Sequence, residues 1–269
     1  MKKNRQPYSG AGITENDSIV GRGMIAGIAF IIIVVFILAV VQLEKSGDCD
    51  RKGGSCVQTS GRFAPPATAP AVIKSDRPLT ELYVMSFCPY GIYVENAFRP
   101  VVDLLGNSTD IQVRYIATVP GNTIDTAQSL HGNVEAIEDV RQLCIAKHDP
   151  EKFWKYLAAF NTQCYPVWNN PAAFSACQKN ITAALGIQMP VVDQCTSGSE
   201  GLGLLKADEA RSISSGAQSS PSLLINGQKY SGPRTSEAFK QAVCSHFESP
   251  PSQCDTVPSS QPTAASGSC

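Results

Sequence analysis

Residues 79–106 read LTELYVMSFCPYGIYVENAFRPVVDLLG, and this stretch decides the fold. Residues 79–87 are nearly all apolar or aromatic, as is typical of a central strand that is buried on both faces. After residues 88–91, CPYG, apolar side chains recur at helical spacing: Val94, Phe98, Val101 and Leu105. Residues 111–117, IQVRYIA, then alternate as a second strand. The pattern predicts a strand, a helix and a strand, with a cysteine where the helix begins.

A second group of elements is expected near the other end of the chain. Residues 222–225 have the composition of a strand, and Asn226-Gly227 is a strong signal for a two-residue hairpin turn into a return strand at 228–230. Residues 235–247 predict an amphipathic closing helix. Between these halves, residues 120–215 are mostly helical in pattern. The sequence therefore predicts an α/β domain that carries a helical insertion.

The segment from residue 24 to residue 41, MIAGIAFIIIVVFILAVV, contains no charge. Its length lies within the range of about 17–25 residues that a membrane-spanning helix needs. A secretory signal has a shorter apolar core, of roughly 7–15 residues, and a cleavage site with small residues, which the following Gln-Leu-Glu-Lys does not provide. We therefore expect a retained transmembrane anchor. Basic residues before and after it differ only slightly in number, and favour a cytoplasmic N-terminus.

The chain holds 10 cysteines among 269 residues, and this content places the main domain outside the cytoplasm. Disulfides persist in oxidising compartments and are rare in the cytosol. We expect a single-pass membrane protein whose C-terminal domain lies in a periplasm, at a cell surface or in a secretory lumen. Three histidines and the absence of paired CxxC motifs argue against a zinc site, so no metal or cofactor is expected. The net charge of -1 gives no support to a nucleic-acid partner.

Composition divides the rest of the chain into segments. Residues 1–23 are expected to be cytoplasmic, residues 42–78 to form a flexible linker, and residues 79–248 to form the folded domain. Residues 249–269, rich in Ser and Pro, are expected to be a disordered tail.

The cysteines outside the folded domain could pair among themselves. Cys49 and Cys56 are expected to close a small loop, and Cys254 could pair with Cys269 or one of the two could be free. Six cysteines would then remain, so either Cys88 is paired or the domain holds a second free thiol. Six cysteines allow 15 pairings, and the sequence does not choose among them. Structural disulfides are expected for five cysteines: Cys144, Cys164, Cys177, Cys195 and Cys244.

The strand–Cys-Pro-x-x–helix opening resembles the active-site turn of the thioredoxin superfamily. Ser220-Pro221-Ser222, just before the hairpin, resembles its cis-proline loop, and the helical insertion is similar to that of the bacterial disulfide oxidoreductases. The resemblance implies a thioredoxin-like fold with Cys88 as the catalytic cysteine. It also implies an active-site turn that includes Pro89 and Gly91, and substrate-binding roles for three residues: Pro221, Ser220 and Tyr90.

Residues 129–144, SLHGNVEAIEDVRQLC, carry a narrower resemblance. The gamma-interferon-inducible lysosomal thiol reductases have a signature of the form C-Q-H-G-x-x-E-C-x-x-N-x-x-x-x-C. Four residues are in register with it: His131, Gly132, Glu135 and Cys144. Four others depart from it: Ser129, Leu130, Ala136 and Asp139. The chain resembles a divergent relative of that family in which a dispensable disulfide has been lost.

Cys88 has the setting of a reactive thiol. A helix N-terminus presents unpaired N–H groups and the positive end of the helix dipole, which lower the pKa of a thiol. The thiolate is the attacking species in disulfide exchange. Dithiol enzymes carry a second cysteine three residues further on, where this chain has Gly91. Resolution of a mixed disulfide at Cys88 would therefore require an external thiol or a cysteine elsewhere in the domain.

We predict a membrane-tethered thiol–disulfide oxidoreductase of monothiol type, which acts on protein thiols or disulfides and is recycled by a reducing or oxidising partner thiol. The alternative is a redox-inactive binding or chaperone-like module that uses the groove beside Pro221. A third option, a metal or cluster held by Cys88 and an external thiol, has no second ligand in the sequence. The state of Cys88 separates the first two hypotheses.

Overall fold

The structure is a computed structural model, and it describes residues 71–259 and 267–269. The predicted cytoplasmic segment, the anchor at 24–41, nearly all of the linker and the Cys49–Cys56 loop lie outside the described residues. Within the described ranges, no helix has both the length and the apolar character that crossing a bilayer requires.

A mixed sheet forms the centre of the described domain. Its strand order is β2-β1-β3-β4, where β1 is Leu79–Val84, β2 is Asp110–Tyr115, β3 is Ser222–Ile225 and β4 is Gln228–Lys229. β1 runs parallel to β2 and antiparallel to β3, which pairs antiparallel with β4. The connection between β1 and β2 is the long helix α2 (Pro89–Leu105), as a parallel crossover requires.

β1 is the central strand that its apolar composition predicts. Every residue from Thr80 to Val84 is buried, including the carboxylate of Glu81. Glu81 remains charged in this position because the guanidinium of Arg211 donates to both of its oxygens, at 2.8 and 2.6 Å. Desolvation of Glu81 works against ionisation, but the bonds and charge of Arg211 outweigh it and lower the pKa of the carboxyl group.

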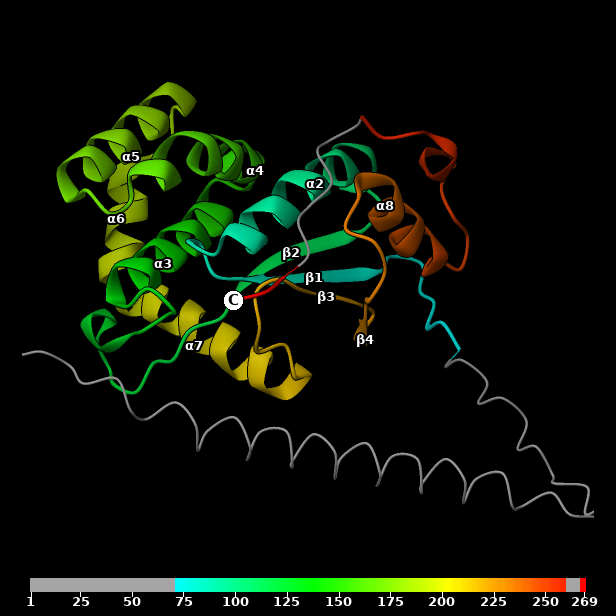
Figure 1. Ribbon diagram of the computed structural model, residues 1–269, viewed down its shortest axis with the longest axis horizontal. Coiled ribbons are helices and arrows are strands. Elements are labelled where there is room, and N and C mark those ends of the chain that lie inside the picture. Colours follow the sequence, from blue (N-terminus) through cyan, green and yellow to red (C-terminus); the bar gives the residue numbers. More distant parts are fainter. Residues whose placement is uncertain (1–70, 260–266) are drawn as a thin grey trace, which may run out of the picture. The chain divides into compact units, whose positions relative to one another are not determined.

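Helices cover both faces of the sheet (Figure 1). α2 and α8 (Ser236–Ser245) pack together on one face, and α7 (Ser199–Ser215) lies against β2 on the other. The other helices of the insertion gather beyond one end of the sheet: α3 (Asn133–His148), α4 (Pro150–Ala159), α5 (Pro171–Leu185) and α6 (Met189–Ser197). A short helical turn, η2 (Ile124–Thr126), precedes α3, and two others, η3 (Phe160–Cys164) and η4 (Tyr165–Val167), connect α4 to α5. Residues 124–215 are thus largely helical, within the range that the sequence pattern indicates.

The hairpin that joins β3 to β4 turns at the predicted dipeptide. Asn226 and Gly227 have φ of 47° and 76°, the positive values that a type I′ turn requires. Asn226 also fixes the N-terminal edge of β1, because its Oδ1 accepts a hydrogen bond from the backbone N–H of Leu79 at 2.9 Å. The return strand β4 ends at Lys229, one residue earlier than predicted.

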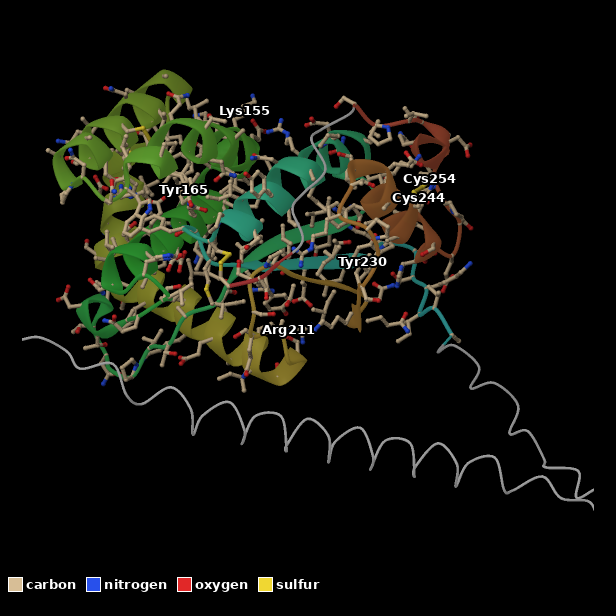
Figure 2. The ribbon with its side chains drawn as sticks, in the orientation of Figure 1. Lys155, Tyr165, Arg211, Tyr230, Cys244 and Cys254 are labelled. Carbon is tan, nitrogen blue, oxygen red and sulfur yellow. A yellow bond between two sulfur atoms is a disulfide. The ribbon has the colours of Figure 1, made fainter. Side chains whose placement is uncertain are left out.

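Three disulfides tie helices of the domain together. Cys144–Cys195 joins α3 to α6, Cys164–Cys177 joins η3 to α5, and Cys244–Cys254 joins α8 to the turn η5 (Ser252–Asp255), where Figure 2 shows the two labelled cysteines side by side. All five cysteines predicted to be structural are therefore disulfide-bonded.

The disordered tail expected over residues 249–269 is not what the described part of that segment shows. Cys254 pairs with Cys244, not with Cys269, and lies within η5. The side chain of Lys240 donates to the carbonyl oxygen of Thr256 at 2.8 Å. The disulfide and this contact hold residues 252–256 against α8, which a Ser- and Pro-rich composition alone does not indicate.

Candidate active site

The active-site turn joins β1 to α2, and Cys88 is the N-cap of that helix. Cys88 has an extended backbone, and its N–H donates to the carbonyl oxygen of Met85 at 3.0 Å. Pro89 follows at the first helical position, where a missing N–H costs nothing. No acidic residue lies in the first turn to offset the positive end of the helix. The turn therefore provides the electrostatic setting that the sequence predicts for a reactive sulfur.

The loop before β3 lies against this turn. The Ser220–Pro221 peptide bond is cis, and the Oγ of Ser220 accepts a hydrogen bond from the N–H of Met85 at 3.0 Å. The Sγ of Cys88 lies 3.4 Å from the carbonyl oxygen of Ser220. Two segments that are separated by 132 positions in the sequence thus meet at the sulfur, as the resemblance to the cis-proline loop implies.

Cys88 is not a free thiol in this structure, because it forms a disulfide with Cys269. Cys88 is completely buried beneath this bridge. The site therefore holds two cysteines, one in the turn and one 181 positions further along the chain. This corrects the monothiol description of the site. Of the two alternatives that the cysteine count left open, a paired Cys88 or a second free thiol, the structure shows a paired Cys88.

The segment Gly267–Cys269 is bound along the cis-proline loop by backbone hydrogen bonds. The N–H of Cys269 donates to the carbonyl oxygen of Ser220 at 2.7 Å, and the N–H of Ser220 donates to the carbonyl oxygen of Cys269 at 3.2 Å. Gly267 lies so close to Tyr90 that a Cβ atom added at this position would collide with the ring. The guanidinium of Arg234 donates to the carbonyl oxygen of Gly267 at 2.5 Å. The predicted substrate-binding residues Ser220, Pro221 and Tyr90 thus surround this segment of the same chain.

Two buried carboxylates of α3 hold the backbone that leads into Cys88. Glu135 accepts hydrogen bonds from the N–H of Phe87 and, with its other oxygen, from the N–H of His131, both at 2.7 Å. Asp139, one turn further along α3, accepts from the N–H of Ser86 at 3.1 Å. Sequence reasoning gave neither residue a role at the site, although Glu135 lies in the signature of residues 129–144. The signature, together with the spacing of four residues that places 135 and 139 on one face of a helix, could have indicated that both carboxylates lie at the site.

An aromatic cluster packs beside the turn. The ring of Phe87 stacks on Trp168 at a centroid distance of 4.9 Å and meets the edge of Phe174 at 5.6 Å. His131 packs on Trp168 at 5.2 Å, and its Nδ1 lies 3.1 Å from Glu135. These contacts place His131 beside Phe87, at a centroid distance of 6.2 Å, and give it a positioning role in the loop.

Burial changes the protonation of several carboxyl groups behind the site. Burial raises the pKa of Asp139 well above its ordinary value, and the neighbouring charge of Glu135 adds to the effect. Burial raises the pKa of Glu138 as well, although Arg141 opposes it. On α2, burial raises the pKa of Glu95 to about 7, against the stabilising hydrogen bond from Asn161. Such groups favour the neutral form where no cation reaches them.

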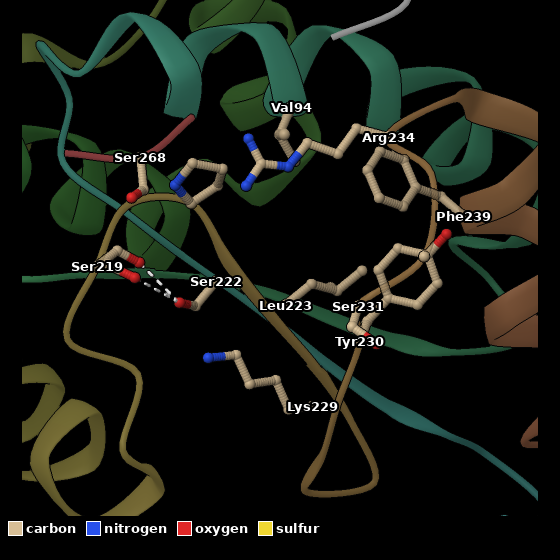
Figure 3. A pocket seen from close by; sticks show the side chains of 12 residues that line it. Val94, Ser219, Ser222, Leu223, Lys229, Tyr230, Ser231, Arg234, Phe239 and Ser268 are labelled. Atoms are coloured by element: carbon tan, nitrogen blue, oxygen red, sulfur yellow. Dashed lines mark hydrogen bonds between the residues drawn. The ribbon is translucent and has the colours of Figure 1, made fainter. Parts of the chain in front are cut away.

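A pocket lies beside the bound segment and the cis-proline loop (Figure 3). Its volume is about 280 Å³, and Ser268 and Pro221 lie on its wall. Buried apolar side chains of α2, β3 and α8 form its floor: Val94, Leu223 and Phe239. Lys229 and Arg234 lie at its rim.

One group of metal-ligating residue types is present among the described residues: His148, Cys195 and Glu200. The sulfur of Cys195 is in the disulfide with Cys144, and Glu200 already pairs with Lys147 at 2.7 Å and with His148 at 3.1 Å. A disulfide sulfur is not the thiolate that binds metals, so this group does not support a metal centre.

Comparisons with solved structures return proteins of low sequence identity. A DsbA from Mycobacterium tuberculosis is 17% identical, with a TM-score of 0.46 over 68% of this chain and 94% of that one. A disulfide bond oxidoreductase, DsbG, from the same organism is 16% identical, with a TM-score of 0.47 over 68% and 89%. The thiol-disulfide oxidoreductase MdbA of Corynebacterium diphtheriae is 18% identical, with a TM-score of 0.45 over 63% and 84%. No curated protein matches the sequence.

A family model gives the stronger relationship. The model of the vacuolar sorting receptor thioredoxin-like domain matches residues 106–244, from the end of α2 to α8. This range is more than half of the chain and contains the helical insertion, the cis-proline loop and β3. The α/β domain with its mixed sheet is accordingly thioredoxin-like, and the chain belongs to the family of vacuolar sorting receptor thioredoxin-like domains.

Proposed function

We propose that this protein is a thiol–disulfide oxidoreductase whose redox couple is Cys88 and Cys269. The observation that carries the proposal is the Cys88–Cys269 disulfide at the N-terminus of α2, with the cis-proline loop against it. The three other disulfides of the described residues join helices to neighbouring elements, whereas this one joins the active-site turn to residues 267–269, which belong to no helix or strand. A disulfide exchanges readily when an attacking thiolate can reach it and when the thiolate that leaves is stabilised. The N-terminus of α2 stabilises the thiolate of Cys88.

The exchange can be written with both sulfurs of the couple. A substrate thiolate attacks the Sγ of Cys88, a substrate–Cys88 disulfide forms, and Cys269 leaves as a thiolate that takes up a proton. The second thiol of the substrate, as a thiolate, attacks the substrate sulfur of this mixed disulfide and expels Cys88 as a thiolate, which takes up the other proton. The substrate loses two electrons and two protons, and the Cys88–Cys269 disulfide becomes two thiols. The reverse sequence reduces a substrate disulfide, and the relative potentials of the partners set the direction.

The proposal includes the location of the domain. The uncharged segment 24–41 would anchor the chain in a membrane, with residues 1–23 in the cytoplasm and the domain outside it. Four disulfides among the described residues are consistent with an oxidising compartment. The likeness to the gamma-interferon-inducible lysosomal thiol reductases is part of the proposal and rests on four residues: His131, Gly132, Glu135 and Cys144.

The test is oxidation of a peptide that carries two thiols, catalysed by the full chain purified in detergent. We expect turnover by the native protein with an oxidant such as oxidised glutathione to regenerate it, and none by Cys88→Ser. In the reducing direction, Cys269→Ser should attack a disulfide between two peptides, release one peptide as a thiol and keep the other on Cys88, because Cys269 is no longer there to displace it; mass spectrometry would locate this mixed disulfide. The control Cys177→Ser opens the Cys164–Cys177 bridge and should keep the activity. Equal rates for the native protein and Cys88→Ser would contradict the proposal and favour a redox-inactive binding module.

A further inference from the structure

The bound segment Gly267–Cys269 shows how a cysteine-containing peptide lies in this site. Its cysteine exchanges two backbone hydrogen bonds with Ser220, which any extended peptide could form, so they carry no sequence preference. The chain direction is fixed by this pairing. The residue immediately before the cysteine, here Ser268, therefore lies on the wall of the pocket beside Pro221. Specificity would arise from what that residue's side chain meets in the pocket.

Serine is too short to use this pocket. The cavity of about 280 Å³ extends from Ser268 over an apolar floor that Val94, Leu223 and Phe239 form. A side chain with several methylene groups could cover that floor, and burial of each methylene favours binding. The size and lining of the cavity thus favour a longer side chain at this position.

The polar lining of the same pocket is positively charged. Lys229 and Arg234 both line it, and Figure 3 shows them on opposite sides of the cavity. No Asp or Glu is among the lining residues that the structure describes. Lys229 is exposed and forms no ion pair with any residue in the described ranges. The acidic residue of α8, Glu237, pairs with Lys240 at 3.0 Å.

We propose that the pocket selects substrates in which an acidic residue precedes the reacting cysteine, with glutamate preferred to aspartate. The two methylenes of a glutamate would lie on the apolar floor, and its carboxylate would reach the cationic rim. This inference rests on the proposed function, because it describes the substrate of the same site. It names the substrate class as a polypeptide with a Glu-Cys sequence in extended conformation.

The test measures how fast Cys88 attacks peptides that differ at one position. The protein is the full chain with Cys269→Ser, purified in detergent, so that Cys88 is a free thiol. The probes are capped peptides Ala-Gly-Xaa-Cys-Ala in which the cysteine carries a 2-thiopyridyl group, with Glu, Asp, Gln or Lys at Xaa and glycine at the position of Gly267. The Cys88 thiolate forms a disulfide with the peptide sulfur, the sulfur–sulfur bond to the pyridyl group breaks, and the thiopyridine that leaves is followed by absorbance. The uncharged leaving group adds no charge of its own to the comparison.

We expect the glutamate peptide to react about three- to tenfold faster than the glutamine peptide, because ion pairs with partly exposed cations contribute little binding free energy. We expect the lysine peptide to react slowest. At about 1 M salt, where the screening length is about 3 Å, the ratio should fall toward one. Lys229→Glu should abolish or reverse the preference. Lys155→Glu is the matched control, because it makes the same charge change at an exposed lysine of α4 outside the pocket (Figure 2).

The outcomes separate the two proposals. Equal rates for the glutamate and glutamine peptides, with both reactions lost in Cys88→Ser, would overturn the acidic preference and leave the oxidoreductase in place. The same would follow if Lys155→Glu changed the preference as much as Lys229→Glu. Release of thiopyridine that does not depend on Cys88 in any peptide would overturn both.

Discussion

A Cβ atom placed on Gly91 would lie 2.7 Å from the Oγ of Ser220, closer than side chains approach in folded proteins. Gly91 occupies the position where a dithiol turn has its second cysteine. Here the serine hydroxyl fills that space and accepts the hydrogen bond of Met85. The second cysteine of the site therefore comes from outside the turn, and Cys269 provides it.

Gly91→Ala should destabilise the fold by about 1–3 kcal/mol, because the new methyl group displaces the Ser220 hydroxyl. Ser220→Ala should cost about 1–3 kcal/mol, since the N–H of Met85 loses its acceptor. The double variant should cost less than the sum, because Ser220→Ala removes the atom that Gly91→Ala meets. Denaturant unfolding of the four proteins measures this coupling, and strictly additive costs would contradict the contact.

Cys269→Ser should convert Cys88 into a reactive thiol. The N-terminus of α2 favours its thiolate, so its pKa should lie below the value of about 8.5 for an ordinary cysteine. Iodoacetamide labelling against pH, with the labelled site located by mass spectrometry, measures this. Cys254→Ser supplies the comparison, because it leaves Cys244 unpaired near the C-terminal end of α8. A Cys88 that titrates at or above the pKa of Cys244 would count against an activated sulfur.

Glu135→Ala should destabilise the protein by about 2–4 kcal/mol, because it leaves two backbone N–H groups without their charged acceptor. Glu135→Gln keeps one acceptor oxygen and should cost less. Hydrogen exchange locates the effect, and the amides of Phe87 and His131 should lose protection first. Unchanged protection at both amides in the alanine variant would show that Glu135 does not hold the turn.

Glu95 should make stability depend on pH. Burial raises its pKa from 4.5 to about 7, so between these values the folded state binds more protons than the unfolded state. The free energy of unfolding should then fall as pH rises from about 4.5 to 7, by an amount on the order of 2–3 kcal/mol.

Glu95→Gln should remove this part of the pH dependence, since a glutamine still accepts from Asn161 but does not titrate. The native protein and the variant should differ more at pH 8 than at pH 5, with the variant the more stable at pH 8. Unfolding curves at several pH values give the comparison, with Glu151→Gln on the surface of α4 as the control. A constant difference across this range would refute the assignment.

Local patterns in the sequence were sufficient for the elements around the site. The apolar run of β1, the helical spacing of α2 and the Asn226-Gly227 turn depend on neighbouring residues, and the structure contains all three, although β1 ends at Val84 and not at residue 87 as predicted. Cys88 at the start of α2 follows from the same local pattern. These features need no knowledge of distant contacts.

The parts that sequence did not reveal depend on distant contacts. Cys88 and Cys269 are 181 positions apart, and nothing local to either marks the other as its partner. Cys254 was assigned to a disordered tail because its neighbours are Ser and Pro, whereas its partner lies on α8. Glu135 and Asp139 accept hydrogen bonds from backbone N–H groups of the turn. Because nearly every residue has such a group, the sequence does not show which N–H groups these carboxylates bind.

The Cys244–Cys254 disulfide also determines how far Cys269 can travel when it is released from Cys88. Cys269 lies 15 positions beyond Cys254, a contour of about 50 Å even at full extension. Confinement to a sphere of that radius corresponds to an effective concentration on the order of millimolar. An external thiol would have to reach that concentration to compete with Cys269 for a mixed disulfide at Cys88. Opening the bridge on α8 would lengthen the chain to Cys269 and weaken its advantage over thiols in solution.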